Sequence, residues 1–243
     1  MIILPLFGWI AAIQVPSDPI VTDRPDFTES AVVVPNRSIQ IEAGLTSSWV
    51  DRTKGISLPE VLVRVGLGER VEARIGLPRW NSLDSARGSA SGFDDLYLGA
   101  KIQLGPSGGW DLALIPAIYI PAGAVEFRSE KAAPELKVAY ATEIDSRTSL
   151  SAMTSGLWMT EGGTRVVDWG QTVSLGISLN TKTAMFLEYA GTFRDKAEPS
   201  HIAHAGFTFK PSPDRQWDIH FGMSLSGGRR RDPFLGFGYA QKF

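Results

Sequence analysis

Few residues of this sequence are arranged for catalysis or metal binding. His201 and His204 are three positions apart, so in an extended strand they point to opposite faces, which disfavours joint metal ligation. His220 and Ser224 share a face and invite comparison with barrel phospholipases, which use His and Ser on a lipid-accessible face. The sequence contains no HExxH, Walker, GxSxG or paired-cysteine motif. We therefore predict no catalytic residues, no metal and no cofactor.

Charged residues recur instead at alternate positions of short apolar stretches. In residues 70–76, Arg70, Glu72 and Arg74 alternate with Val71, Ala73 and Ile75, which gives a strand one charged and one apolar face. Both signs of charge occur, so the charged faces could line a narrow pore or form a closed network of ion pairs that fills the interior. The candidate lumen-lining residues are Glu42, Arg64, Arg70, Glu72, Arg74, Asp95, Lys101, Asp111, Lys137, Glu188, Asp218 and His220.

The elements that position these residues are strands of about ten residues with a period of two, which follow one another from residue 38 to the end of the chain. About twelve can be distinguished, and the stretch 110–120, which is apolar on both faces and contains Pro116, is the weakest and suggests a bulge. Long and short connections alternate, as in an up-and-down barrel with short periplasmic turns. This order places both termini in the periplasm. The long connections are 50–55, 78–92, 121–133, 159–168, 194–200 and 226–233, and the short ones are 66–69, 105–108, 143–146, 180–182 and 210–214.

Such two-faced strands need an apolar surround and a polar interior. A closed antiparallel barrel in a membrane supplies both, and it satisfies every backbone group within the sheet. Six tryptophans lie at or near expected strand ends, as in an interfacial aromatic girdle: Trp49, Trp80, Trp110, Trp158, Trp169 and Trp217. The alternative is a soluble up-and-down barrel with an apolar interior. A net charge of −2 excludes a strongly basic nucleic-acid-binding face, and the absence of cysteine excludes disulfides.

The two ends of the chain carry further signals. Residues 1–16 resemble a signal peptide, although the usual positive n-region is missing, and residues 17–37 read as a periplasmic arm before a barrel of residues 38–243. In the arm, the motif residues Asp23, Arg24, Asp26 and Glu29 could fold into the periplasmic mouth and pair with Arg70 or Arg74, or the arm could simply lead into the first strand. The aromatic C-terminus, Phe243, fits recognition by the machinery that assembles outer-membrane barrels.

The last expected extracellular loop contains three consecutive arginines. Arginine binds phosphate groups through two hydrogen bonds, so this loop could contact lipopolysaccharide, or it could be a solvated loop. The three residues are Arg229, Arg230 and Arg231.

The arm also carries a family signature. The stretch from Val21 to Ala31, VTDRPDFTESA, followed by VVVP at 32–35 and IQIEAG at 39–44, resembles the outer-membrane barrel family labelled "putative MetA-pathway of phenol degradation". Asn36 and Arg37 stand where a glycine-containing turn is usual in that family. The resemblance covers the first quarter of the chain by motif and the rest by barrel pattern. It implies passage of small, perhaps aromatic, molecules across the outer membrane.

We therefore expect an all-β transmembrane barrel in the bacterial outer membrane. Its expected function is passive passage of small aromatic or hydrophobic solutes, and its expected partners are outer-membrane lipid, lipopolysaccharide, the barrel-assembly machinery and the solute. Two alternatives are a barrel enzyme acting on lipid and a closed structural barrel. The enzyme is disfavoured because His220 and Ser224 are both expected to face the lumen.

Overall fold

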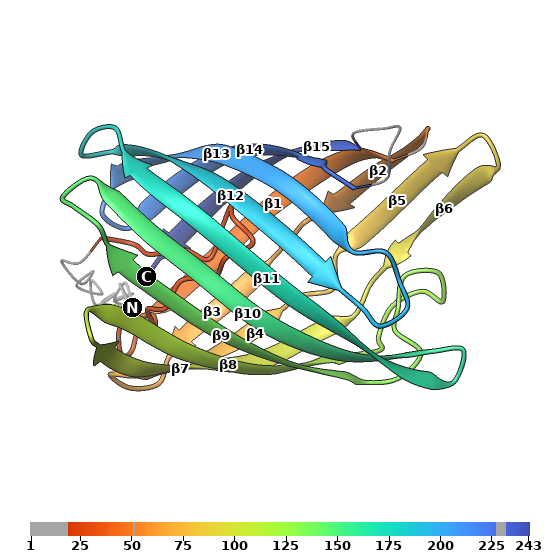
Figure 1. Ribbon diagram of the computed structural model, residues 1–243, viewed down its shortest axis with the longest axis horizontal. Coiled ribbons are helices and arrows are strands. Elements are labelled where there is room, and N and C mark those ends of the chain that lie inside the picture. The colour runs from red at the N-terminus through yellow and green to blue at the C-terminus, as the bar shows by residue number, and fades with distance from the viewer. Residues whose placement is uncertain (1–18, 51, 227–231) are drawn as a thin grey trace, which may run out of the picture.

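The computed structural model describes residues 19–50, 52–226 and 232–243 (Figure 1). The expected signal peptide and Arg229, Arg230 and Arg231 lie outside the described residues. No helix in the described part of the chain is long and apolar enough to cross a membrane. The strands are β1 (Ile39–Val50), β2 (Thr53–Leu58), β3 (Leu62–Gly66), β4 (Val71–Gly76), β5 (Trp80–Ser85), β6 (Gly88–Phe93), β7 (Leu96–Ser107), β8 (Trp110–Ile120), β9 (Ala133–Glu143), β10 (Thr148–Glu161), β11 (Thr164–Ser178), β12 (Thr183–Phe193), β13 (Ser200–Ser212), β14 (Arg215–Ser224) and β15 (Pro233–Lys242).

These segments form one closed antiparallel barrel of twelve strands. Three barrel strands are each interrupted once, so β2 with β3, β4 with β5, and β6 with β7 count as single strands. Both β2 and β3 pair with β1, one along each half of its length. The barrel closes where β1 pairs with β15, from Gln40↔Lys242 to Ser48↔Phe234. The predicted all-β barrel of about twelve strands is confirmed.

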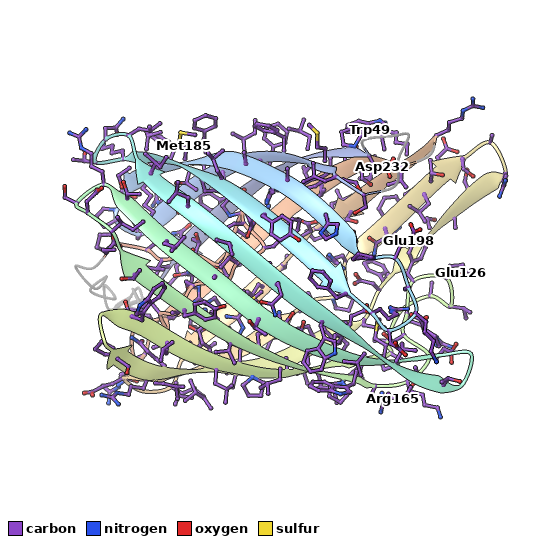
Figure 2. The ribbon with its side chains drawn as sticks, in the orientation of Figure 1. Trp49, Glu126, Arg165, Met185, Glu198 and Asp232 are labelled. Carbon is purple, nitrogen blue, oxygen red and sulfur yellow. The ribbon has the colours of Figure 1, made fainter. Side chains whose placement is uncertain are left out.

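The two faces of the wall have opposite chemistry. The outward side chains are largely apolar, and Met185 and Trp49 can be followed projecting from the wall (Figure 2). The exposed set includes Ile39, Ile41, Val71, Ile75, Val173, Leu187, Phe207, Trp217, Ile219, Phe221 and Phe237. The inward side chains include buried Gln40, Glu42, Arg64, Glu72, Arg74, Lys101, Glu188, His204 and Asp218. An apolar exterior around a charged interior is the arrangement of a barrel in lipid, so the soluble alternative is wrong.

Five of the expected connections differ from the prediction. Two are short ones, because β7 extends to Ser107 and β13 to Ser212, so residues 105–108 and 210–214 are mostly strand. Residues 78–92 are not a loop but contain the hairpin of β5 and β6, and the expected loops 50–55 and 159–168 are mostly strand. Residues 159–168 contain the end of β10, a turn at Gly162 and Gly163, and the start of β11, and both glycines have positive φ. The serine- and glycine-rich composition of residues 78–92 resembles a loop, but ladder pairing from Trp80↔Phe93 to Ser85↔Gly88 satisfies its backbone.

The irregularity expected at Pro116 occurs elsewhere. Pro116 pairs with Leu136 of β9 in unbroken register. The register shift lies between Gln103 and Gly105 of the neighbouring strand β7, and Gly105 has a φ of 89°. A bulge commonly places a glycine in this left-handed conformation, which has no steric cost for glycine.

The chain before β1 lies inside the barrel as an arm, which we define as residues 19–37. In Figure 1 the red and orange segment runs within the end of the barrel that carries the C-terminus and the short turns. The arm ends in a turn in which Ser38 donates to Pro35 and Arg37 adopts a φ of 63°, the conformation that a glycine would take. Ala31 packs against Ala113, Ile115, Ala139 and Met153. This contact explains why β8 is apolar on both faces.

Candidate functional site

The carboxylate of Asp23 is the contact that joins the arm to the largest number of wall cations. Its Oδ1 accepts from Nζ of Lys101 at 2.8 Å and from the backbone and hydroxyl of Ser30. Its Oδ2 accepts from Nη1 of Arg74 at 2.6 Å and lies 3.3 Å from Nη1 of Arg64. The cations come from β3, β4 and β7, three neighbouring barrel strands, so Asp23 joins the arm to all three.

Two wall carboxylates complete this cluster. Glu72 accepts from Nε and Nη2 of Arg64 and from Nη1 of Arg74, at 2.8, 3.0 and 2.8 Å. Glu42 accepts from Arg64 at 3.0 Å and from the backbone N–H groups of Asp23 and Arg24 at 3.1 and 3.0 Å. Glu72 also accepts from the backbone N–H of Val34 at 2.6 Å. The wall therefore holds the arm by its backbone as well as by its charge.

Without the arm, the buried charges of the wall residues in this cluster do not balance. The wall contributes the three cations Arg64, Arg74 and Lys101 but only the two anions Glu42 and Glu72, all at most 2% exposed. Asp23 supplies the third anion. Because an unpaired charge in a dry interior is costly, the wall cluster is balanced only while the arm is docked.

A second anion of the arm, Glu29, extends the network to a further barrel strand. Its carboxylate bonds to Arg74 and to Lys137 of β9, each at 2.8 Å. Lys137 also lies 3.0 Å from Glu135 and 5.5 Å from the centre of the Tyr97 ring.

A chain of hydrogen bonds holds the opposite side of the arm. Glu188 of β12 accepts from the backbone N–H groups of Phe27 and Thr28 at 2.9 and 2.8 Å. It also bonds to Nδ1 of His204, whose Nε2 lies 2.9 Å from Nδ1 of His220. These distances fit one consistent proton arrangement, in which His220 donates to His204 and His204 donates to Glu188.

Arg24 connects this chain to the far wall. Its Nη2 lies 3.5 Å from Nε2 of His220 and 3.4 Å from Asp218, while its Nη1 donates to Glu60 at 2.8 Å.

The environment of the arm shifts the pKa values of its carboxyl groups in different directions. Burial opposes the ionisation of Asp23, but Arg64, Lys101 and Arg74 hold its pKa well below its usual range. Burial likewise opposes the ionisation of Glu29, yet Arg74 and Lys137 lower its pKa to about 2. Asp26 has the opposite shift, because burial and the neighbouring charge of Glu188 raise its pKa well above its usual range.

The arm separates two cavities of the lumen. A cavity of about 430 Å³, which we call the vestibule, lies on the side of the long connections, and its lining includes Arg24, Phe27, Tyr97, Tyr119 and Lys137. A second cavity of about 340 Å³ lies on the side of the short turns and is lined by the opposite surface of the arm together with wall residues. The two cavities share no lining residue. The docked arm therefore lies across the path through the barrel.

The predicted lumen-lining residues fall into three groups in the structure. Eight are buried in the interior: Glu42, Arg64, Glu72, Arg74, Lys101, Glu188, Asp218 and His220. Lys137 is half-buried beside Glu29, and Asp95 lines the vestibule. Asp111 is half-buried at the start of β8, and Arg70 is exposed in the turn before β4, where it does not join the cluster around Asp23. Of the two arginines expected to pair with the arm, only Arg74 forms ion pairs with it within the described part of the chain.

Sequence reasoning missed several interior residues. His204 was not among the expected lumen-lining residues, but it is 3% exposed and central to the series of hydrogen bonds that holds the arm. The even-numbered positions of β13 face inward, and this alternation could have found it. Gln40 and Gln216 were also missed, and they donate to Val21 and Thr22 of the arm at 2.9 and 2.7 Å.

Ser224 is not arranged as a nucleophile. Its hydroxyl hydrogen-bonds within the chain to the backbone of Ser226, at 3.3 and 3.4 Å. The ring of His220 bonds instead to His204 and lies near Arg24. The serine–histidine contact that hydrolysis would need is thus replaced by contacts that hold the arm.

Comparisons with known proteins agree with this architecture. The family model described as "Putative MetA-pathway of phenol degradation" matches residues 22–243. An outer membrane channel from Pseudomonas putida F1 is similar with a TM-score of 0.66 and 15% identity, covering 90% of this chain and 99% of that one. The NanC porin has a TM-score of 0.60 and 9% identity over 84% of this chain and 100% of its own. The CymD monoaromatic hydrocarbon channel has a TM-score of 0.50 and 9% identity, covering 86% and 89%. No curated protein matches.

Proposed function

The chain belongs to the family described as "Putative MetA-pathway of phenol degradation", and from this premise we propose that it is an outer-membrane channel for passive passage of small aromatic or hydrophobic solutes. The observation that carries the proposal is the vestibule, which ends on a charge-held arm. A barrel that served only as a scaffold would need no cavity of about 430 Å³ in its interior.

The lining of the vestibule suits a small aromatic solute with a polar group. Tyr97 and Tyr119 meet edge to face, with ring centres 5.2 Å apart. The Tyr97 hydroxyl is buried and has no hydrogen-bond partner among the described residues. A solute hydroxyl could bond to this group while its ring packs against the two tyrosines and Phe127. One similar fold, CymD, is described as a monoaromatic hydrocarbon channel, which is consistent with this solute class.

Because the docked arm lies across the lumen, we favour a gated channel over a permanently open one. In this view the arm leaves the lumen, or shifts within it, when a solute or a change at the mouth weakens its ion pairs. Each docked arm then represents a closed channel.

The proposal includes the orientation of the barrel. In it, the short turns and both chain ends face the periplasm, and the opposite end of the barrel, where Figure 2 labels Glu126, Arg165 and Glu198, faces the outside of the cell. It also includes recognition of Phe243 by the barrel-assembly machinery, contact of the last outer loop with lipopolysaccharide, and no enzymatic activity. The contacts of Ser224 support the last of these.

The test is a comparison of cold and boiled samples on a gel, followed by single-channel recording of the same refolded protein in a planar bilayer. We expect a heat-modifiable band and stepwise conductance that phenol reduces in the wild type. Tyr97→Phe, which keeps the ring and removes the hydroxyl, should conduct equally and respond less to phenol. A folded barrel without conductance, also after the arm is loosened, would favour a closed structural barrel and contradict the proposal.

A further inference from the structure

Three neighbouring barrel strands are interrupted at the same level. Residues 59–61 separate β2 from β3, residues 77–79 separate β4 from β5, and residues 94–95 separate β6 from β7. The pairing resumes in the same register on both sides, with Leu62↔Gly76 on one side and Leu58↔Trp80 on the other. We call this line of residues, which lie between the strand segments, the seam.

The local sequence accounts for the seam. Pro59 and Pro78 lie within the two longer interruptions, and proline has no N–H to give to a ladder. Neighbouring strands keep a few hydrogen bonds within the seam: the backbone N–H of Leu77 donates to the carbonyl of Val61 at 2.9 Å, and that of Asp94 donates to the carbonyl of Arg79 at 3.0 Å. The Asp94 side chain also accepts from Nε of Arg79 at 2.7 Å.

The seam lies within the apolar belt of the exterior. On its hairpin side, Leu58, Trp80 and Phe93 are 36, 36 and 53% exposed and stand in neighbouring register. On the other side, Ile75 and Leu77 are 38 and 46% exposed. Lipid would therefore meet the seam from outside.

The vestibule meets the seam from inside. Its lining includes residues of every interruption: Glu60 and Val61, Leu77 and Arg79, and Asp94 and Asp95. Irregular backbone at membrane depth is tolerated where it is buried in protein or lines a water-filled cavity, and the vestibule is such a cavity.

From these observations we propose that the seam is a lateral portal, through which an apolar or aromatic solute passes between the vestibule and the lipid of the outer membrane. This inference rests on the proposed channel function and adds a route to it. Apolar solutes favour this route because the seam joins the cavity directly to a hydrocarbon surround, whereas the axial path crosses the charged cluster around Asp23. Ions cannot take it, because lipid does not solvate them.

The arm contacts the portal as well as the axial path. Arg24 donates to Glu60 at 2.8 Å, and Glu60, which lies in the first interruption, donates from its backbone to Gly44 of the neighbouring strand β1 at 2.8 Å. The portal is therefore held from inside by the residue that also contacts His220 and Asp218.

The experiment closes the seam with a disulfide, since the chain has no cysteine of its own. Val61→Cys with Leu77→Cys joins two facing positions that line the vestibule. The matched control, Leu150→Cys with Leu175→Cys, joins two facing positions on β10 and β11, which do not line it. The readouts are the fluorescence rise of 1-N-phenylnaphthylamine in intact Gram-negative cells and potassium chloride conductance of the purified protein.

We expect wild-type cells to take up the dye several-fold faster than cells without the protein. The oxidised seam variant should lose this difference and keep its conductance, reduction should restore uptake, and the control should match the wild type. The reduced form and the heat shift on a gel verify folding, and Leu77→Trp, which fills the seam without a cross-link, should also lose uptake.

Three results would overturn the portal. If the oxidised seam variant takes up dye as the wild type does, solute uses the axial path, and the proposed channel function stands without the portal. If oxidation abolishes both uptake and conductance, the cross-link acts on the axial path. If wild-type protein gives neither uptake nor conductance, the proposed function fails and the portal with it.

Discussion

Replacing Asp23 by asparagine should release the arm. The change removes the arm's charge that contacts all three cations Arg64, Arg74 and Lys101, while the shape and the hydrogen-bonding oxygen of the side chain remain. Glu29, which contacts Arg74 alone among the three, is left in place. Removing one partner of a buried ion pair costs about 3 to 5 kcal/mol, because it leaves the other partner uncompensated. At about 1.4 kcal/mol for each factor of ten, the docking equilibrium should shift by roughly a hundredfold or more towards the released arm.

Hydrogen exchange of the arm amides measures this shift directly. The N–H groups of Asp23, Arg24, Thr28 and Val34 donate to carboxylates of the wall, so they exchange when the arm undocks. In Asp23→Asn we expect their exchange to be faster by roughly a hundredfold, while amides of the barrel ladder keep their protection. Channel recordings of the same protein should show a higher open probability.

Asp26→Asn is the matched control, because it removes a carboxylate of the same arm three positions away. Burial and the neighbouring Glu188 raise the pKa of Asp26 well above its usual range, so docking favours the neutral carboxyl group, which an amide resembles closely. Its arm amides should exchange no faster than in the wild type. Equal exchange in the wild type and in Asp23→Asn would refute the view that charge holds the arm, and equal acceleration in both variants would show that any change in the arm has this effect.

Three further predictions follow from the same contacts. Because the pKa values of Asp23 and Glu29 are lower in the docked arm, their contribution to docking is fully present above about pH 4.5, and that of Glu29 is lost only as the pH falls towards about 2. Arm exchange, corrected for its intrinsic rate, should therefore not rise on their account between pH 7 and pH 5. Glu188→Gln weakens hydrogen bonds to a charged acceptor worth about 1.5 to 3 kcal/mol, so the amides of residues 27–28 should exchange at least about tenfold faster; unchanged rates would place the anchor elsewhere. Ser224→Ala should leave both conductance and background lipid hydrolysis unchanged, and a loss of measurable hydrolysis would revive the enzyme alternative.

The fold was predictable because alternate residues of a strand in a membrane barrel match the polarity of the lumen and of the lipid. The alternation of Arg70, Glu72 and Arg74 with apolar neighbours needs no knowledge of any other strand, since the side chains of an extended chain point to opposite sides. The count of strands and the sorting of most connections follow in the same way. The hairpin of β5 and β6 was not predicted, because its serine-rich sequence lacks the alternation of charged and apolar residues. Its strands are recognised only from their pairing with each other.

The sequence by itself determined which residues are charged, which face they share and that an acidic arm precedes the barrel. Only the tertiary structure decided which charges meet. Glu29 lies 108 positions from Lys137 in the sequence, and Thr28 lies 160 positions from Glu188. These residues come into contact only when the barrel closes with a defined register. The same closure aligned Pro59 and Pro78 in the seam and placed His204 beside Glu188. The local alternation of residues predicts whether each face of a strand meets lipid or the lumen. Contacts across the lumen depend instead on how the whole sheet curves and on the register in which its first and last strands pair.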